Sequence, residues 1–314
     1  MAAESASTVS KVVLVMLSTG KQGGAVVRAL AKANESAPAD TTPWLVLAQT
    51  RDPSSAQSKL LQSLRGVRLH KGTPLDAPAL FAAAPAPVYA VFSVQKSYDN
   101  PRGVEGEMAE AKALADAAAK HGVKHFVYAS VNRGGVPDTG VEHFESKRLV
   151  EEYLKTKHPT LPVTVLRPVT FMDELVAGDP KSALARVVKI LFLTQLKRTT
   201  RLQFIACSDI GGVAALVLQN PERYVGEVVD LAGDQLSPKD MDDVWREVFG
   251  EEMRPQMVGG TALAWAVCKG RKELRTMFKF WNEGGYNADI PALREQYPEL
   301  KDWRTFLKTE VTST

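Results

Sequence analysis

The sequence predicts an α/β fold: a doubly wound parallel sheet, followed by a smaller, mainly helical C-terminal lobe. Short apolar runs rich in valine alternate with helical segments up to Pro168. Such runs are typical of parallel strands that are buried on both faces, and the alternation indicates helices on both sides of the sheet. The first run, Lys11 to Leu17, leads into a glycine-containing turn and then a helix, and the alternation stops after Pro168.

The strands expected before Pro168 are β-branched or aromatic runs bounded by polar segments. They are Lys11–Leu17, Trp44–Thr50, Val67–Lys71, Val88–Ser93, His125–Ser130 and Val163–Arg167. Helical spacing, or a composition rich in alanine, glutamate and lysine, predicts the helices that connect them. They are Gly23–Ala33, Glu105–His121 and Val141–Thr156.

The second half predicts strands at Leu202–Ala206 and Glu227–Leu231 and several helices. The helices are Ser182–Leu193, Ile210–Gln219, Pro238–Phe249 and Thr261–Phe280. Ser237 and Asp240 mark the start of one of them, because serine is a favoured N-cap and an acid in the first turn is favourable.

The bulk composition is that of an ordinary globular chain of 314 residues, 45% hydrophobic and 24% charged. A net charge of +3 does not argue for direct nucleic-acid binding. Cys207 and Cys268 lie too far apart for metal-ligand spacing and are interpreted as reduced thiols. Without a secretory signal or a membrane span, a cytoplasmic or nuclear location is expected.

Three segments are predicted: a disordered tail over residues 1–10, a nucleotide-binding domain over 11–170 and a smaller lobe over 171–314. A ligand is expected between domain and lobe, at the carboxyl ends of the strands.

The turn after the first strand is the strongest motif. Gly20 lets backbone amides approach a pyrophosphate, Gly23 lets the helix pack close to the strand, and the helix N-terminus favours an anion. This pattern predicts a Rossmann dinucleotide site, and the alternative is an ordinary tight turn. The residues expected to contact the cofactor are Ser18, Thr19, Gly20, Lys21, Gln22 and Gly23.

The second strand ends at Arg51, where an acid would favour NAD and a base favours NADP. A guanidinium pairs with a 2′-phosphate through two hydrogen bonds, so NADP(H) is the expected cofactor. Lys59 is expected to assist, and Ser93, which ends the fourth strand, is a further cofactor candidate. The alternative for Arg51 is a solvated side chain paired with Asp52.

His143 and Lys147 occupy the i, i+4 positions at which short-chain dehydrogenases carry tyrosine and lysine. In those enzymes the lysine holds the ribose and lowers the tyrosine pKa. Here the lysine remains and histidine replaces tyrosine, so His143 is either a proton donor or a histidine that only shapes a pocket. Ser130 is either a substrate-polarising serine or a turn residue.

The chain resembles the NmrA-like family of atypical short-chain dehydrogenases. The resemblance rests on TGKQGGAVVRAL, VYAVFSVQ, ALADAAAKHGVKHFVYASV, HFESKRLVEEYL, VTVLRPVTFMDEL, VVDLAGDQLS and the turn at Asp209-Ile210-Gly211. It implies NAD(P) binding at Gly20, Gly23 and Arg51, and an active-site lysine at Lys147. Histidine at position 143 looks like the branch of the family that senses NADPH.

Two positions depart from the family pattern, because Leu17 replaces the first glycine of the loop and Gly72-Thr73-Pro74 replaces a Gly-Asp pair. Two functions stay open. One is an NADPH-dependent oxidoreductase of a small carbonyl, quinone or phenolic substrate; the other is a non-enzymatic NADPH or redox sensor that regulates a protein partner such as a transcription factor. No membrane partner is expected, and a homodimer is left open.

Overall fold

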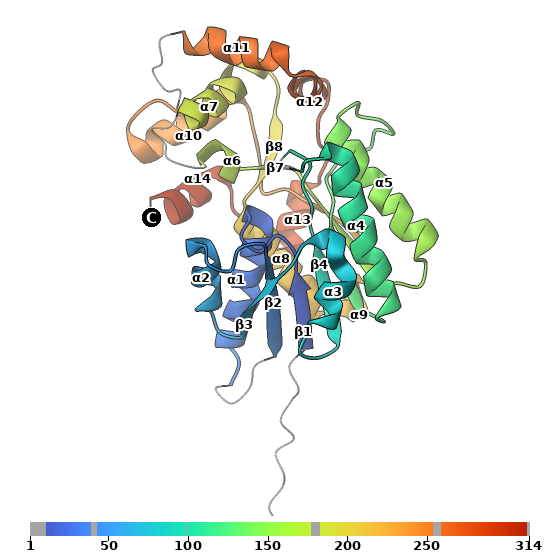
Figure 1. The fold of residues 1–314 in the computed structure, drawn as a ribbon. Coiled ribbons are helices and arrows are strands. Elements are labelled where there is room, and N and C mark those ends of the chain that lie inside the picture. Colours follow the sequence, from blue (N-terminus) through green and yellow to red (C-terminus); the bar gives the residue numbers. More distant parts are fainter. Residues whose placement is uncertain (1–10, 39–42, 99, 177–182, 254–258, 313–314) are drawn as a thin grey trace, which may run out of the picture. The chain divides into compact units, whose positions relative to one another are not determined.

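The computed structural model describes the chain except residues 1–10, 39–42, 99, 177–182, 254–258 and 313–314 (Figure 1). The predicted tail, residues 1–10, lies outside the described residues. The chain forms two compact units, each made of several segments. Unit 1 comprises residues 1–130, 146–166 and 210–229, and unit 2 comprises 131–145, 167–209 and 230–314. Both units therefore draw on sequence from either side of residue 170.

A seven-stranded sheet in the order β3-β2-β1-β4-β5-β6-β9 carries the first unit. Strands β1 to β6 pair in parallel, with Val13 opposite Val46 on one side of β1 and opposite Ala90 on the other. The order reverses at β1, so the predicted doubly wound, Rossmann-like fold is confirmed. The strands are β1 (Lys11–Val15), β2 (Trp44–Thr50), β3 (Val67–Lys71), β4 (Val88–Ser93), β5 (His125–Ala129), β6 (Val163–Pro168) and β9 (Val228–Leu231).

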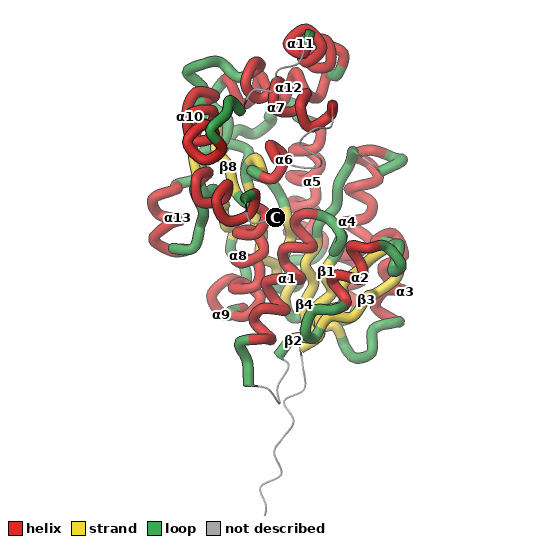
Figure 2. Tube along the Cα trace, turned by 90° about the vertical axis from the view of Figure 1, so that its left-hand side faces the viewer, coloured by secondary structure: helices red, strands yellow, loops and turns green. Residues whose placement is uncertain are grey.

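Helices cover both faces of this sheet (Figures 1 and 2). Helices α1, α2 and α8 lie on one face and α3, α4 and α5 on the other. A Cβ on Gly211 would lie 2.5 Å from the backbone carbon of Ala25, so α8 packs closely on α1. The helices are α1 (Lys21–Glu35), α2 (Ala56–Gln62), α3 (Ala77–Ala82), α4 (Gly103–Lys120), α5 (Glu142–Lys157), α8 (Cys207–Gln219) and α9 (Pro221–Tyr224), with a 3₁₀ turn, η1 (Pro74–Asp76), before α3.

The core of unit 1 follows from the apolar runs. Every residue from Val12 to Met16 is buried, as are Val91, Phe92 and Phe126 on the neighbouring strands. Burial of a side chain of this size contributes about 1.5–3 kcal/mol, so the central strands fix the unit. The first strand is shorter than predicted, because it ends at Val15 and leaves Leu17 in the turn.

The second unit contains a three-stranded sheet in the order β10-β8-β7. Of its strands, the sequence predicted only β8, as Leu202–Ala206. Its strands are β7 (Thr170–Phe171), β8 (Leu202–Ile205) and β10 (Asp234–Leu236). The helices are α6 (Asp173–Val176), α7 (Ala183–Gln195), α10 (Pro238–Phe249), α11 (Gly260–Gly270), α12 (Lys272–Asn282), α13 (Ile290–Gln296) and α14 (Trp303–Phe306), followed by a π-helical turn, η2 (Leu307–Val311).

Two local predictions for this unit have different outcomes. The start of α10 is confirmed, because Ser237 and Asp240 form a capping box. The single helix predicted over Thr261–Phe280 is wrong. Helix α11 ends at Gly270, Arg271 is extended with φ −116° and ψ 106°, and α12 then begins. Glycine is a poor helix former, which accounts for the break.

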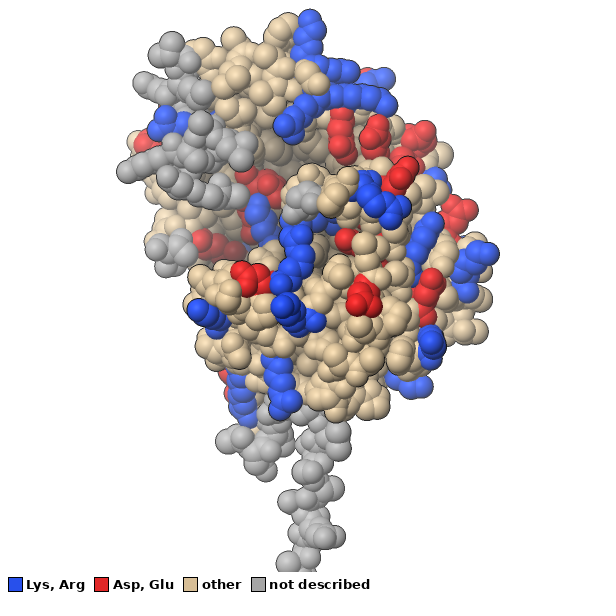
Figure 3. All heavy atoms as spheres, in the orientation of Figure 1, with Lys and Arg blue, Asp and Glu red and all other residues tan. Residues whose placement is uncertain are grey.

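No helix among the described residues is both long enough and apolar enough to cross a membrane. Figure 3 shows acidic and basic side chains interspersed over the face that it draws.

Candidate functional site

The turn after β1 is closed by its own hydrogen bonds. The Gly20 amide donates to the Leu17 carbonyl at 2.8 Å, and the Ser18 hydroxyl donates to the Val15 carbonyl at 2.7 Å. A Cβ on Gly23 would lie 2.4 Å from the carbonyl oxygens of both Met16 and Leu17. Only glycine therefore fits where α1 meets the end of β1, which is the close packing that the motif requires.

Leu17 adopts φ +45° and is the one non-glycine residue of the described chain with a positive φ. A leucine at this position could also have adopted an extended conformation in a wider turn, but the structure has the strained, positive-φ conformation. A left-handed conformation costs a residue with a Cβ roughly 1–2 kcal/mol. The loop has kept a backbone shape that suits the glycine of the family pattern.

Gln49, near the end of β2, holds this loop in place. Its Oε1 accepts from the Leu17 amide at 3.0 Å, its backbone carbonyl accepts from the Ser18 amide at 3.2 Å, and its Nε2 donates to the Gly72 carbonyl at 2.7 Å. The sequence analysis did not single out Gln49. The available signal was a polar residue close to the end of an otherwise apolar strand.

The N-terminus of α1 has no side-chain cap. Gly20 caps the helix without any side-chain hydrogen bond. Helix amides at this end lack intrahelical partners and carry a partial positive charge, which suits a phosphate. The Oε1 atom of Gln22 is buried and has no hydrogen-bond partner in the described part of the chain. Thr19 is exposed and Lys21 is half-buried beside this end of the helix.

Arg51 follows β2 directly, and its side chain is exposed. Among the described residues it has no hydrogen bond or ion pair. Asp52, the partner in the alternative interpretation, instead accepts from the amide of Ser54 at 2.9 Å and from its hydroxyl. These hydrogen bonds lower the pKa of Asp52. The predicted helper, Lys59, is exposed on α2.

The serine candidates are buried and already hydrogen-bonded within unit 1. The Ser93 hydroxyl accepts from Gln95 Nε2 at 3.1 Å, and the Ser130 hydroxyl donates to the Glu151 carboxylate. Ser130 is 3% exposed. In this arrangement both hydroxyls bond to other side chains of the unit.

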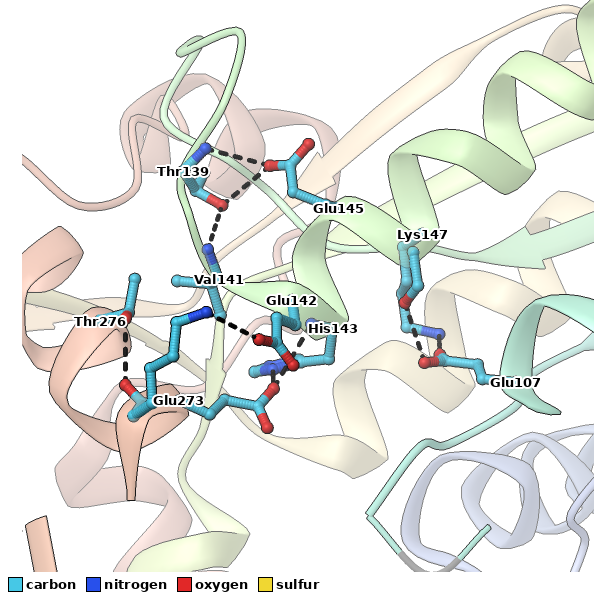
Figure 4. A network of polar contacts seen from close by, with 11 residues as sticks. Glu107, Thr139, Val141, Glu142, His143, Glu145, Lys147, Glu273 and Thr276 are labelled. Atoms are coloured by element: carbon cyan, nitrogen blue, oxygen red, sulfur yellow. Dashed lines mark hydrogen bonds and ion pairs between the residues drawn. The ribbon is translucent and has the colours of Figure 1, made fainter. Parts of the chain in front are cut away.

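Lys147 lies on α5, and its ammonium contacts Glu107 (Figure 4) and Gln95, both residues of unit 1. Its Nζ lies 2.7 Å from Glu107 Oε1 on α4 and donates to the Gln95 carbonyl at 3.2 Å. It also lies 5.7 Å from the ring centroid of Tyr128. The sequence analysis missed Glu107. The available signal was its place on the stripe of α4 that also carries Ala111, Leu114 and Ala118, all of them buried.

His143 begins the same helix but belongs to unit 2. Its Nδ1 lies 2.5 Å from Glu273 Oε1 on α12, and this hydrogen bond lowers the pKa of Glu273 (Figure 4). Lys272, the neighbour of Glu273, pairs with Glu142 at 3.2 Å. No pattern in the sequence indicates Glu273 as the partner of His143.

The cofactor candidates of unit 1 share one edge of the sheet. The glycine turn follows β1, Arg51 follows β2, Ser93 ends β4 and Ser130 follows β5. Parallel strands bring their carboxyl ends to the same edge, and the order of this sheet reverses between β2 and β4. Open sheets of this kind bind ligands at that crevice.

The chain is similar in sequence to known proteins. A Dictyostelium discoideum NmrA-like family domain-containing protein is 23% identical over 95% of this chain and 97% of its own length. The NmrA-like family domain-containing oxidoreductase FrzB of a Cladobotryum species is 25% identical over 92% of this chain and 90% of its own.

The fold is also similar to solved structures. NmrA, a negative transcriptional regulator, in complex with NADP has a TM-score of 0.68 at 17% identity, covering 97% of this chain and 96% of that one. NmrA in complex with NAD has a TM-score of 0.69 at 16% identity over the same shares. A triphenylmethane reductase from a Citrobacter species, complexed with NADP(H), has a TM-score of 0.67 at 18% identity, covering 96% of this chain and 100% of that one.

A model of the NmrA-like family matches residues 9–307, nearly the whole chain. The expected resemblance is thereby confirmed, and the chain belongs to the NmrA-like family.

Proposed function

We propose that the chain binds NADP(H) at the carboxyl edge of the unit 1 sheet and acts as a reductase of a small carbonyl, quinone or phenolic substrate. The observation that carries the proposal is the strand–turn–helix at β1, with Arg51 exposed and without a described partner at the end of the neighbouring strand. Such a turn accepts a pyrophosphate, and a guanidinium at that position suits a 2′-phosphate.

The residues of this edge fit a dinucleotide. The backbone around Gly23 leaves no room for a Cβ, and no side chain caps the N-terminus of α1. The buried Oε1 atom of Gln22 has no hydrogen-bond partner among the described residues. An ammonium has three donors. Two of those of Lys147 are directed to Glu107 and Gln95, and no described residue takes the third. That donor is available to a ribose hydroxyl of the cofactor.

The proposed reaction is a hydride transfer. When bound, the dinucleotide would supply a hydride to an electrophilic carbon of the substrate, and the substrate oxygen would take up a proton. The ammonium of Lys147 stabilises negative charge near the cofactor ribose, as a fixed positive charge does at a reacting centre. Water or His143 is the proton source in the sequence-based hypothesis. The names of several relatives, including FrzB, contain the word oxidoreductase, which supports this class of reaction.

The alternative is a non-enzymatic NADPH or redox sensor that regulates a protein partner. One observation favours it: residue 143 is a histidine engaged with Glu273, where a dehydrogenase of this type has a tyrosine proton donor. NmrA itself is described as a negative transcriptional regulator.

Oxidation of NADPH distinguishes the two functions. The purified chain is incubated with NADPH and a panel of quinones, aromatic ketones and phenolic carbonyl compounds, and loss of NADPH absorbance is followed. A reductase consumes NADPH with at least one acceptor, and Lys155→Ala, an exposed lysine on the same helix, leaves that rate unchanged. Tight NADPH binding without consumption by any acceptor contradicts the reductase and supports the sensor.

A further inference from the structure

We infer that Glu107 is a positioning residue for Lys147, and that this buried carboxylate fixes the ammonium so that one donor remains for the cofactor. The inference rests on the proposed function, because it assigns Lys147 to the dinucleotide. Each oxygen of Glu107 has its own donor from neighbouring residues of α5. Oε1 lies 2.7 Å from Lys147 Nζ, and Oε2 accepts from the Ser146 hydroxyl at 2.9 Å.

The burial of this pair is its second notable feature. The side chains of Lys147 and Glu107 are 11% and 2% exposed. Acidic and basic side chains are almost never buried unless they are paired, and a buried ion pair adds little stability compared with packed apolar groups of the same volume. Stability alone therefore does not account for an ion pair between α5 and α4, a helix whose other buried residues are glycine, alanine and leucine.

The geometry assigns a role to each neighbour of the ammonium. Glu107 supplies the compensating charge, the Gln95 carbonyl fixes the ammonium beyond the end of β4, and the ring of Tyr128 lies beneath it at 5.7 Å. Gln95 is itself bonded to Ser93 through its side chain. A flexible lysine side chain loses much rotamer freedom when it is fixed, so a site that fixes it beforehand binds its ligand more tightly.

Glu107→Gln tests this role because it removes the charge and keeps the shape. Glu105→Gln is the matched control, on the same helix and exposed. The first readout needs no cofactor: the ¹⁵N signal of the Lys147 ammonium, identified by its loss in Lys147→Met. We expect a protected signal in the wild-type chain, its loss in Glu107→Gln and its retention in Glu105→Gln.

The second readout is NADPH affinity. Loss of one charge-assisted hydrogen bond that orders the site is expected to weaken binding about tenfold in Glu107→Gln, while Glu105→Gln stays within about twofold. Ser146→Ala removes the hydrogen bond to Oε2 and leaves both partners of the Lys147–Glu107 ion pair in place, so it is expected to give a smaller loss in both readouts. It provides the test should Glu107→Gln fail to fold.

The outcomes separate the two proposals. A wild-type chain that binds no NADPH contradicts the proposed function, and the ammonium signal alone then decides whether Glu107 fixes Lys147. A protected signal that persists in both Glu107→Gln and Ser146→Ala overturns the inference. Unchanged NADPH affinity in both variants, with normal wild-type binding, overturns it as well.

Discussion

Lys147 and Arg51 are both cations assigned to the cofactor, and the structure gives them opposite surroundings. Lys147 is buried against Glu107, while Arg51 is exposed and has no partner among the described residues. The two cations are therefore expected to contribute differently to folding stability and to binding. The charge of Lys147 is part of the folded unit, so its removal is expected to destabilise the fold. Arg51 contacts only the dinucleotide in the proposed function, so its removal is expected to weaken binding alone.

The largest expected loss of stability follows from removing the buried cation, Lys147. Lys147→Met leaves the Glu107 carboxylate buried without its counter-charge, which typically costs about 3–5 kcal/mol of unfolding free energy. Urea denaturation measures the loss. Arg51→Ala, the exposed counterpart, is expected to change stability by no more than about 0.5 kcal/mol.

A double variant sharpens the same test. Glu107→Leu combined with Lys147→Met replaces the ion pair by apolar groups and should recover most of the stability lost in the single variant. Additive losses in the double variant would show that the two side chains do not depend on each other.

A smaller effect on stability is expected in the loop after β1, where the backbone of Leu17 is strained. Leu17→Gly and Leu17→Ala both remove the leucine side chain, but only glycine tolerates φ +45° at little cost. The glycine variant should therefore be more stable than the alanine variant by about 1 kcal/mol, as measured by thermal and urea unfolding. Wild-type NADPH affinity is expected to be micromolar or weaker, and Leu17→Gly should tighten it. Equal stability of the two variants would remove strain as the explanation.

A still smaller effect on stability is expected for the pair of His143 and Glu273. Its exposure is intermediate between that of the buried Lys147 and that of the exposed Arg51. The side chains of His143 and Glu273 are 31% and 42% exposed, so solvent screens the interaction and Glu273→Gln should cost less than about 1 kcal/mol. Because the pair lowers the pKa of Glu273 below its ordinary value of 4.5, the stabilisation is present above that pH. It is lost as the pH falls through the lowered value.

Unfolding free energies of the wild-type chain and Glu273→Gln, measured from neutral to acid pH, follow this loss. Their difference should shrink toward zero on acidification, and Glu283→Gln, an exposed control, should show no such trend. A difference that grows as the pH falls would contradict the assignment.

The comparison also shows what the sequence could predict. The strands Trp44–Thr50 and Val88–Ser93 have the predicted bounds, because buried parallel strands leave mainly apolar runs. Val67–Lys71 also has the predicted bounds, although it is an edge strand on which Arg68 and Lys71 are exposed. The glycine turn and Arg51 were readable for a similar reason, since backbone shape and position after a strand define them. Such features need no knowledge of distant contacts.

The partners of the polar and charged residues could not be predicted from the sequence in the same way. Glu107 and Gln49 reach their partners across 40 and 32 positions of sequence, and Glu273 across 130. Periodicity places a residue on a face of an element but does not say which distant residue it meets. In the small sheet of unit 2, β8 was predicted as Leu202–Ala206, but β7 and β10 were missed because they have only two and three residues, too few for a periodic pattern.

The preference for NADPH can be measured by calorimetric titration with NADPH and NADH, using the wild-type chain, Arg51→Ala and the exposed control Arg68→Ala on β3. We expect the wild-type chain to bind NADPH more tightly than NADH. We further expect a loss of about 1–3 kcal/mol for NADPH alone in Arg51→Ala, as for charge-assisted hydrogen bonds to a phosphate, and no change in Arg68→Ala. Equal affinities of the wild-type chain for the two dinucleotides, or an Arg51→Ala variant that keeps its affinity for NADPH, would contradict these expectations.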